Sequence, residues 1–228
     1  NKEGYVLTTT PEGISINGQT ENGVFYGIQT LRKSIPAEAK GATVLIPAGE
    51  IKDEPRFSYR GMHLDVGRHF FPKEFIKKYI DLLALHNMNT FHWHLTEDQG
   101  WRIEIKKYPL LTEIGSCRVD RPGKTFPERR NPRQGEPTVE KGFYTQDEIR
   151  EIVRYAQERH IEVIPEIEMP AHSNAALAAY PLLSCPVVDK FIGVLPGLGG
   201  NHADVIFCAG NDSVFTFLQD ILDEVLEL

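Results

Sequence analysis

One short segment of this chain concentrates side chains that can do chemistry. Residues 91–102 read FHWHLTEDQGWR and contain two histidines, two tryptophans, two adjacent carboxylates and an arginine. Arginine and carboxylate groups form strong hydrogen bonds with hydroxyls, and an indole ring can stack on the apolar face of a sugar. The mixture predicts a binding site for a neutral, hydroxyl-rich ligand, with Asp98 and Trp101 among the residues that bind it.

Two further segments carry residues of the same kind. DVGRHFF at 65–71 supplies Arg68, and EIEMPAHS at 166–173 supplies His172. Each of the three segments follows a stretch that reads as a β-strand, so Arg68, Glu97, Asp98, Trp101 and His172 are expected at neighbouring strand ends.

A metal site is the first alternative reading. His92 and His94 form an H-x-H pair, a spacing that puts both side chains on one face of a strand. The third segment adds only one more histidine, His172. Core histidines with satisfied hydrogen bonds are therefore the favoured interpretation, and the sequence predicts neither a metal nor another cofactor.

The other candidates also have structural alternatives. Asp65 and Glu166 could be held by hydrogen bonds inside the sheet, and Trp101 could pack beneath a loop. Arg68 could pair only with a neighbouring carboxylate, and residues 97–98 could be a solvated loop pair. The sequence leaves these roles open.

The elements that position these residues alternate regularly. Strands are expected at 59–66, 89–95 and 161–168. Helices are expected after Pro72, after a capping box of Thr145 and Glu148, and after a cap at Asn211 or Asp212. The apolar face of the first helix is predicted at Phe75, Tyr79, Leu82 and Leu83, and that of the last at Phe215, Leu218, Leu222 and Val225.

Repeated strand–helix units predict an α/β fold with a parallel sheet, either doubly wound or a barrel. One face of the strands is polar (His63, Asp65; His92, His94; Glu162, Glu166, Glu168) and the other is apolar. A polar inner face favours the barrel, because doubly wound sheets are apolar on both faces. The fold class is therefore α/β, with the first three βα units of a (β/α)₈ barrel over residues 56–228.

Residues 1–55 read as part of a small α+β domain. A hairpin at 5–9 and 14–17 precedes a helix and a strand at 43–51, and residues 52–55 form an exit linker.

The bulk properties exclude some classes of partner. The net charge is −7, from 25 basic and 32 acidic residues, which argues against nucleic acid. No apolar run reaches the length of a membrane span. The cysteines Cys117, Cys185 and Cys208 form no C-x-x-C pair, so a zinc ribbon is excluded. Three unpaired thiols are the simplest reading, and a bridge between Cys185 and Cys208 is left open.

The combined motifs resemble those of family 20 glycoside hydrolases, the β-N-acetylhexosaminidases. The resemblance rests on the run from RGMHLDVGRHF to HLTEDQGWR, on EVIPEIEMPAHS and on FCAGN. It implies a barrel enzyme that removes terminal β-linked N-acetylglucosamine or N-acetylgalactosamine from an oligosaccharide or glycan, and a secreted or periplasmic location. It also implies a substrate-assisted mechanism, in which the acetamido oxygen of the substrate attacks the anomeric carbon.

The resemblance assigns roles to particular residues. Arg68 takes the position that binds ring hydroxyls. Glu97 and His172 take positions that are linked by hydrogen bonds to the acid/base glutamate and help to set its pKa. This chain has Glu97 where many members have Asp, and Ala171 where Gly is frequent.

The acid/base pair of the family is an Asp-Glu that follows Gly-Gly after the fourth strand. The Asp-Glu pairs of this chain lie at 53–54, 147–148 and 223–224, and none follows Gly-Gly. We therefore expect no catalytic residue in this chain, which would be part of a longer enzyme and inactive alone. The free edge of the third strand would allow self-association.

Two other functions remain open. The chain could be a non-catalytic carbohydrate-binding or structural fragment. It could also be a glycosidase that uses Asp98 with Glu166 or Glu168, which would require the two-carboxylate spacing of ordinary glycosidases.

Overall fold

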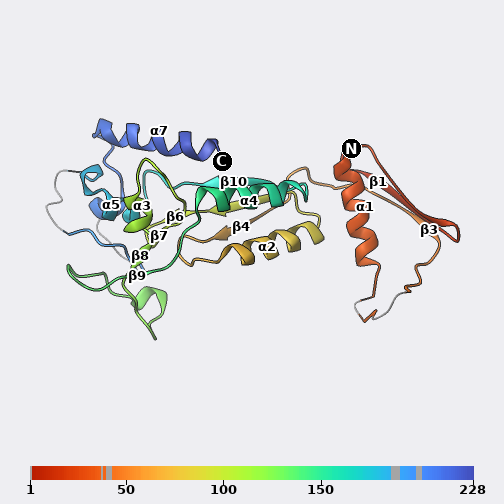
Figure 1. The fold of residues 1–228 in the computed structure, drawn as a ribbon, viewed down its shortest axis with the longest axis horizontal. Coiled ribbons are helices and arrows are strands. Elements are labelled where there is room, and N and C mark those ends of the chain that lie inside the picture. The colour runs from red at the N-terminus through yellow and green to blue at the C-terminus, as the bar shows by residue number, and fades with distance from the viewer. Residues whose placement is uncertain (1, 37, 40–42, 186–190, 199–201) are drawn as a thin grey trace. The chain divides into compact units, whose positions relative to one another are not determined.

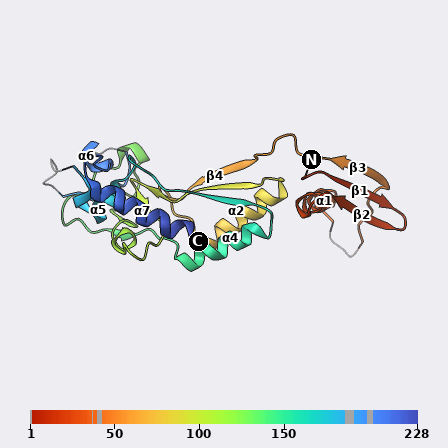
Figure 2. The same cartoon turned by 90° about the horizontal axis from the view of Figure 1, so that it is seen from above.

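The computed structural model describes residues 2–36, 38–39, 43–185, 191–198 and 202–228, and its ribbon is shown in Figures 1 and 2. Two compact units can be distinguished. One comprises residues 1–62, 77–91 and 155–163, and the other residues 63–76, 92–154 and 164–228. Among the helices of the described residues, none has the length and hydrophobicity of a membrane span.

The N-terminal sheet is antiparallel. It consists of β1 (Tyr5–Thr10), β2 (Gly13–Gly18) and β3 (Gly49–Asp53) in the order β2-β1-β3. Helix α1 (Glu21–Lys33) follows the hairpin, and Tyr5, Leu7 and Tyr26 form the core between helix and sheet. The predicted hairpin and helix are confirmed.

The third strand of this sheet begins later than predicted. The sequence indicated residues 43–51, whereas β3 begins at Gly49 and ends at Asp53. Pro47 has no N–H to donate to a strand pairing, and its carbonyl accepts a hydrogen bond of 2.7 Å from the Thr9 hydroxyl. The residues read as the start of the strand therefore lead into it as an irregular segment.

The sheet that carries the candidate site contains β4 (Gly61–Asp65), β5 (Thr90–His94) and β10 (Glu162–Glu166), in the order β10-β5-β4. Its backbone hydrogen bonds show that the strands are parallel. Asn89 donates to Arg60 near the start of β4 and β5, and Val66 donates to His94 near their ends. Glu162 donates to Asn89, and Leu95 donates to Glu166, in the same sense along β10. The α/β class is confirmed.

Three longer helices accompany these strands: α2 (Lys73–Leu85), α4 (Gln146–Gln157) and α7 (Asp212–Leu226). Helix α4 begins with the predicted capping box, since the Glu148 amide donates to the Thr145 hydroxyl at 3.2 Å and Glu148 accepts from the Thr145 amide at 3.1 Å. Lys73 lies 3.0 Å from Glu151, so the first turn of α2 lies beside α4 (Figure 1).

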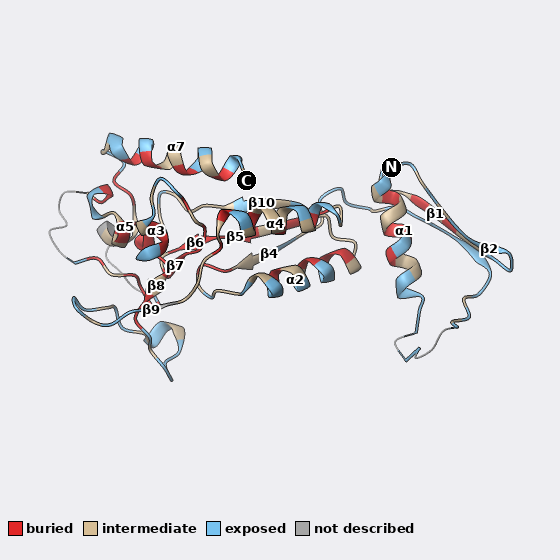
Figure 3. Ribbon diagram, in the orientation of Figure 1, coloured by how far each residue is buried: buried red, intermediate tan, exposed pale blue. Residues whose placement is uncertain are grey.

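The predicted inner faces of α2 and α7 were wrong in part: Leu83 and Val225 are buried as predicted, and the other buried positions are shifted by one residue. In α2 the buried residues are Ile76, Ile80, Leu83 and Ala84, while Phe75 is 39% and Leu82 47% exposed. In α7 they are Val214, Phe217, Ile221 and Val225, while Phe215 is 55% exposed. Both helices carry two adjacent apolar stripes, and contacts with the neighbouring elements decide which of them is buried. Figure 3 shows the buried side of α7.

Short elements form the segments after the strands. They are β6 (Thr96–Glu97), β7 (Gly100–Trp101), α3 (Leu110–Glu113), β8 (Cys117–Arg118), η1 (Phe126–Glu128), β9 (Val139–Glu140), α5 (Asn174–Ala179), η2 (Pro181–Leu183) and α6 (His202–Val205). A disulfide joins Cys185 to Cys208, and Cys117 is free. The alternative of a Cys185–Cys208 bridge therefore holds, rather than three thiols.

Candidate active site

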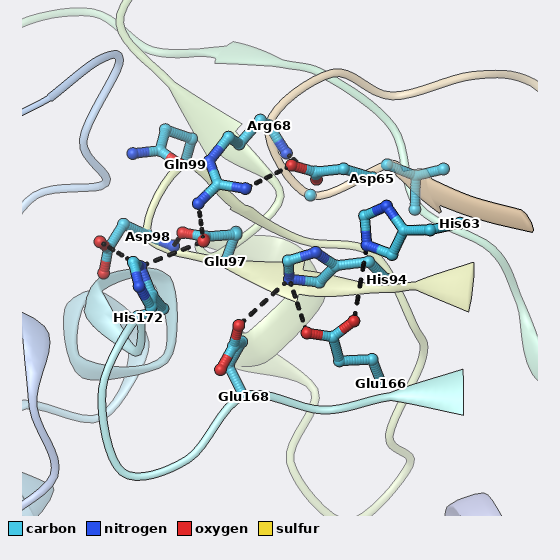
Figure 4. Close-up of polar contacts among 12 residues, drawn as sticks. His63, Asp65, Arg68, His94, Glu97, Asp98, Gln99, Glu166, Glu168 and His172 are labelled. Carbon is cyan, nitrogen blue, oxygen red and sulfur yellow. Dashed lines mark hydrogen bonds and ion pairs between the residues drawn. The ribbon is translucent and has the colours of Figure 1, made fainter. Parts of the chain in front are cut away.

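The predicted strand-end residues lie together. Arg68 follows β4. After β5, Glu97 ends β6 and Asp98 begins the tight turn to β7, and His172 lies in the segment after β10. Figure 4 shows the side chains of Arg68, Glu97 and His172 pointing toward one another. The carboxyl ends of parallel strands meet at one edge of a sheet, which explains why residues so far apart in sequence converge.

Arg68 bridges two carboxylates. Its Nη1 lies 2.5 Å from Asp65 Oδ2, its Nη2 donates to Glu97 Oε1, and its backbone amide donates to Asp65 Oδ1 at 2.9 Å. The Arg68 side chain is 39% exposed, whereas that of Glu97 is 1% exposed. Asp65 thus orients the guanidinium, which neutralises the buried Glu97 and keeps a solvent-facing side for a ligand.

His172 lies between two carboxylates. Its Nδ1 is 3.1 Å from Glu97 Oε1 and 3.3 Å from Asp98 Oδ2. Asp98 is itself held, because its Oδ1 accepts from the Asn174 amide at 3.0 Å and its own amide donates to Glu97 Oε2 at 2.7 Å. The backbone of His172 is left-handed, with φ 52°.

The protonation states of Glu97, Asp98 and His172 depend on one another. Burial raises the pKa of Glu97 to about 7, although the Asp98 amide and the charges of Arg68 and His172 act in the opposite direction. Burial also raises the pKa of Asp98 above its usual value. Burial alone lowers the pKa of His172, but the charges of Glu97, Asp98 and Glu168 outweigh it and raise that pKa. The site therefore holds a proton near neutral pH.

We expect this coupling to be visible in an NMR titration of the His172 ring. In the wild-type protein its pKa should lie above the usual histidine value of about 6.5. Asp98→Asn removes a negative charge next to the imidazolium, which should move the pKa of His172 downward. Circular dichroism of both proteins serves as the control that the substitution leaves the fold intact. An unchanged His172 titration would contradict the coupling.

Trp101 is the candidate whose position differs most from the expected binding role. It is 3% exposed, and its indole Nε1 donates to the Ile103 carbonyl at 2.7 Å. Its ring therefore presents no open face to a sugar in this structure. This burial favours the packing role that the sequence left open over the stacking role.

Arg102 is an important residue that sequence reasoning missed. It is 0% exposed, and its guanidinium donates five hydrogen bonds of 2.9–3.3 Å to backbone carbonyls, those of Val66, Gly67, Gln99, Ser116 and Gly142. A Cβ on Gly100 would lie 2.1 Å from Arg102 Nη2, so the glycine of the QGWR segment makes room for this side chain. Arg102 thus fixes the backbone just before Arg68 and shortly after Glu97.

The histidines and glutamates of the polar sheet face also come together. His94 Nε2 lies 3.7 Å from Glu166 Oε1 and 3.4 Å from Glu168 Oε1. Burial lowers the pKa of His94, against the raising effect of Asp65 and Glu166. Burial and the neighbouring Glu166 raise the pKa of Glu168. The predicted shared face of these residues is confirmed by their contacts.

Comparison with known proteins gives the family. The sequence model of the glycosyl hydrolase family 20 catalytic domain matches residues 57–228, and that of the family's domain 2 matches residues 1–54. The chain belongs to glycosyl hydrolase family 20. It is 49% identical over 232 residues to a beta-hexosaminidase of Porphyromonas gingivalis, in an alignment covering 100% of this chain and 28% of that protein.

Solved family 20 structures are similar as well. A beta-N-acetylhexosaminidase of Bacteroides fragilis matches with 41% identity and a TM-score of 0.79, covering 100% of this chain and 41% of that one. An N-acetyl-beta-hexosaminidase of Streptomyces plicatus in complex with Thio-NAglucal matches with 37% identity and a TM-score of 0.82, covering 99% of this chain and 42% of that one. This family 20 chain therefore spans less than half the length of these relatives.

Proposed function

We propose that the protein carrying this chain is a β-N-acetylhexosaminidase that removes terminal N-acetylglucosamine or N-acetylgalactosamine from glycans. The observation that supports this most directly is the contact of Arg68 and His172 with the same buried Glu97 at the strand ends of a family 20 chain. A mutant of the related Streptomyces plicatus beta-hexosaminidase has been solved with the product GlcNAc, a ligand of the proposed class.

In the proposed mechanism the acetamido oxygen of the substrate displaces the leaving group at the anomeric carbon. Arg68 binds ring hydroxyls through the solvent-facing side of its guanidinium. Asp98 is a further candidate for contact with the substrate, while Trp101 packs behind the site. His172 and Glu97 act together through hydrogen bonds on an acid/base glutamate supplied from outside residues 1–228, and their shared proton helps to set its pKa.

The sheet and its helices are consistent with a barrel enzyme of this kind. The strands β4, β5 and β10 with their helices are the first three βα units of a (β/α)₈ barrel, and residues 1–55 belong to the small α+β domain before it. The outer edge of β10 pairs with a further strand, supplied either by the longer protein or by another copy of the chain.

The test compares two aryl glycosides that differ only in the 2-substituent. The longer protein should hydrolyse an aryl β-N-acetylglucosaminide and leave the matching β-glucoside intact, because the glucoside lacks the acetamido nucleophile. Residues 1–228 alone should give no turnover, since general acid–base assistance, worth about 10²–10⁴-fold, is missing from them.

Other outcomes would favour the alternative functions. Equal hydrolysis of both glycosides would refute substrate assistance and point to Asp98 with Glu166 or Glu168, and Asp98→Asn would then abolish turnover. Binding of N-acetylglucosamine by the longer protein without any hydrolysis would favour a non-catalytic carbohydrate-binding role.

A further inference from the structure

A second cluster lies on the polar face of the sheet. His63 from the middle of β4, His92 from the middle of β5 and Glu166 from the end of β10 converge there. Nε2 of His63 is 3.6 Å and Nε2 of His92 is 2.5 Å from the same Glu166 Oε2. The two imidazoles meet edge to face with their centroids 4.8 Å apart. Two ring nitrogens from different strands thus point at one carboxylate oxygen.

Two buried polar atoms in and beside this cluster lack a hydrogen-bond partner within the described part of the chain. Glu166 Oε2 is buried and accepts no hydrogen bond from any described residue, despite the short approach of His92. The side chain of the neighbouring His94 is only 5% exposed, and its Nε2 also lacks a hydrogen-bond partner among the described residues. Figure 4 shows His94 directed at one oxygen of the Glu166 carboxylate and His63 at the other. Buried polar atoms without such partners commonly mark the place of a water or an ion.

We propose that His63, His92 and Glu166 bind a divalent transition metal, with zinc as the favoured ion. Two imidazoles and one carboxylate are a common zinc ligand set that leaves a fourth position open. Tetrahedral zinc with bonds of about 2.0–2.1 Å holds its nitrogen and oxygen ligands roughly 3.3 Å apart. The three ligand atoms lie within 4.8 Å of one another, and a shift of about 1 Å in the Glu166 carboxylate would relieve the short His92 contact.

The neighbouring clusters fit a metal less well. Glu97, Asp98 and His172 also lie close enough, but the Arg68 guanidinium already occupies Glu97 and would repel a second cation. His94, Glu166 and Glu168 provide only one imidazole.

Zinc titration of the intact protein at neutral pH, with a chromophoric chelator as competitor, tests the proposal. We expect one zinc per chain. His63→Ala and His92→Ala should each weaken binding by roughly tenfold or more, and cobalt should give the visible absorption of a tetrahedral site. Magnesium should not compete, because it prefers oxygen ligands. Circular dichroism checks that all variants remain folded.

Two further variants locate the ion. His86→Ala removes an exposed histidine outside the cluster and should leave the zinc affinity unchanged. His172→Ala removes the imidazole of the competing cluster and should also leave the zinc affinity unchanged. The proposal is wrong if the wild-type protein binds no zinc, if binding survives in both His63→Ala and His92→Ala, or if it is lost in His172→Ala. This result is independent of glycosidase activity.

Discussion

Replacing Arg102 by methionine should lower the free energy of unfolding by about 3–5 kcal/mol, the range seen when one member of a buried charged network is removed. Burial lowers the pKa of Arg102 to about 9, so the side chain is still a cation at neutral pH. Its removal leaves buried carbonyls without their donor, and each such loss costs about 1–3 kcal/mol. Relief of the buried charge offsets only part of this. Urea unfolding monitored by circular dichroism measures the change.

Arg150 provides the matched control. Its side chain is 40% exposed and forms an i,i+3 ion pair with the exposed Asp147, so Arg150→Met should change stability by less than about 0.5 kcal/mol. Arg102→Lys should recover little, because an ammonium group cannot reach five separate carbonyls. If Arg102→Met cost less than about 1 kcal/mol, the anchoring role of Arg102 would be refuted.

Arg68→Ala should reduce kcat/KM of the longer protein on an aryl β-N-acetylglucosaminide by roughly tenfold to 150-fold, corresponding to about 1.5–3 kcal/mol for a charged hydrogen bond. The same change removes the cation beside Glu97, whose buried carboxylate then becomes harder to ionise. Since loss of a positive charge raises a carboxyl pKa, we also expect the pH–rate profile to move toward higher pH.

The control for Arg68 is Arg154→Ala, which removes an exposed arginine of α4 and should leave both the rate and its pH profile unchanged. Arg68→Lys should restore the position of the pH profile more than the rate, because lysine supplies the charge without the fork of donors. Full activity in Arg68→Ala would rule out a role for Arg68 in substrate binding.

Much of the fold could be predicted because its signals are local. The capping box at Thr145 and Glu148 depends only on residues three apart, and it is present as expected. The inner faces of α2 and α7 could not be chosen reliably, because Ile76 and Phe75, or Phe217 and Phe215, are equally apolar. Which of them is buried depends on contacts with distant segments.

The candidate site could likewise be predicted only in part. Arg68, Glu97 and His172 could be found because they follow strands, and parallel strands bring their ends together. The anchoring role of Arg102 had no sequence signal, since its partners are backbone carbonyls that any residue provides. Trp101 shows a limit of this reasoning: an aromatic ring next to carboxylates suggests stacking on a sugar, whereas its indole N–H donates to the Ile103 carbonyl, which favours a packing role.

At His172 the stability of the fold and the function of the side chain favour different residues. At φ 52° a glycine would fit without the steric cost that any side chain carries there. Selection for heat resistance alone would thus favour losing the imidazole. His160 has a similar φ of 55°, so a left-handed histidine is not by itself a mark of function, but at residue 172 the imidazole also contacts Glu97 and Asp98. A glycine at this position in a related chain would keep the backbone conformation and give up that contact.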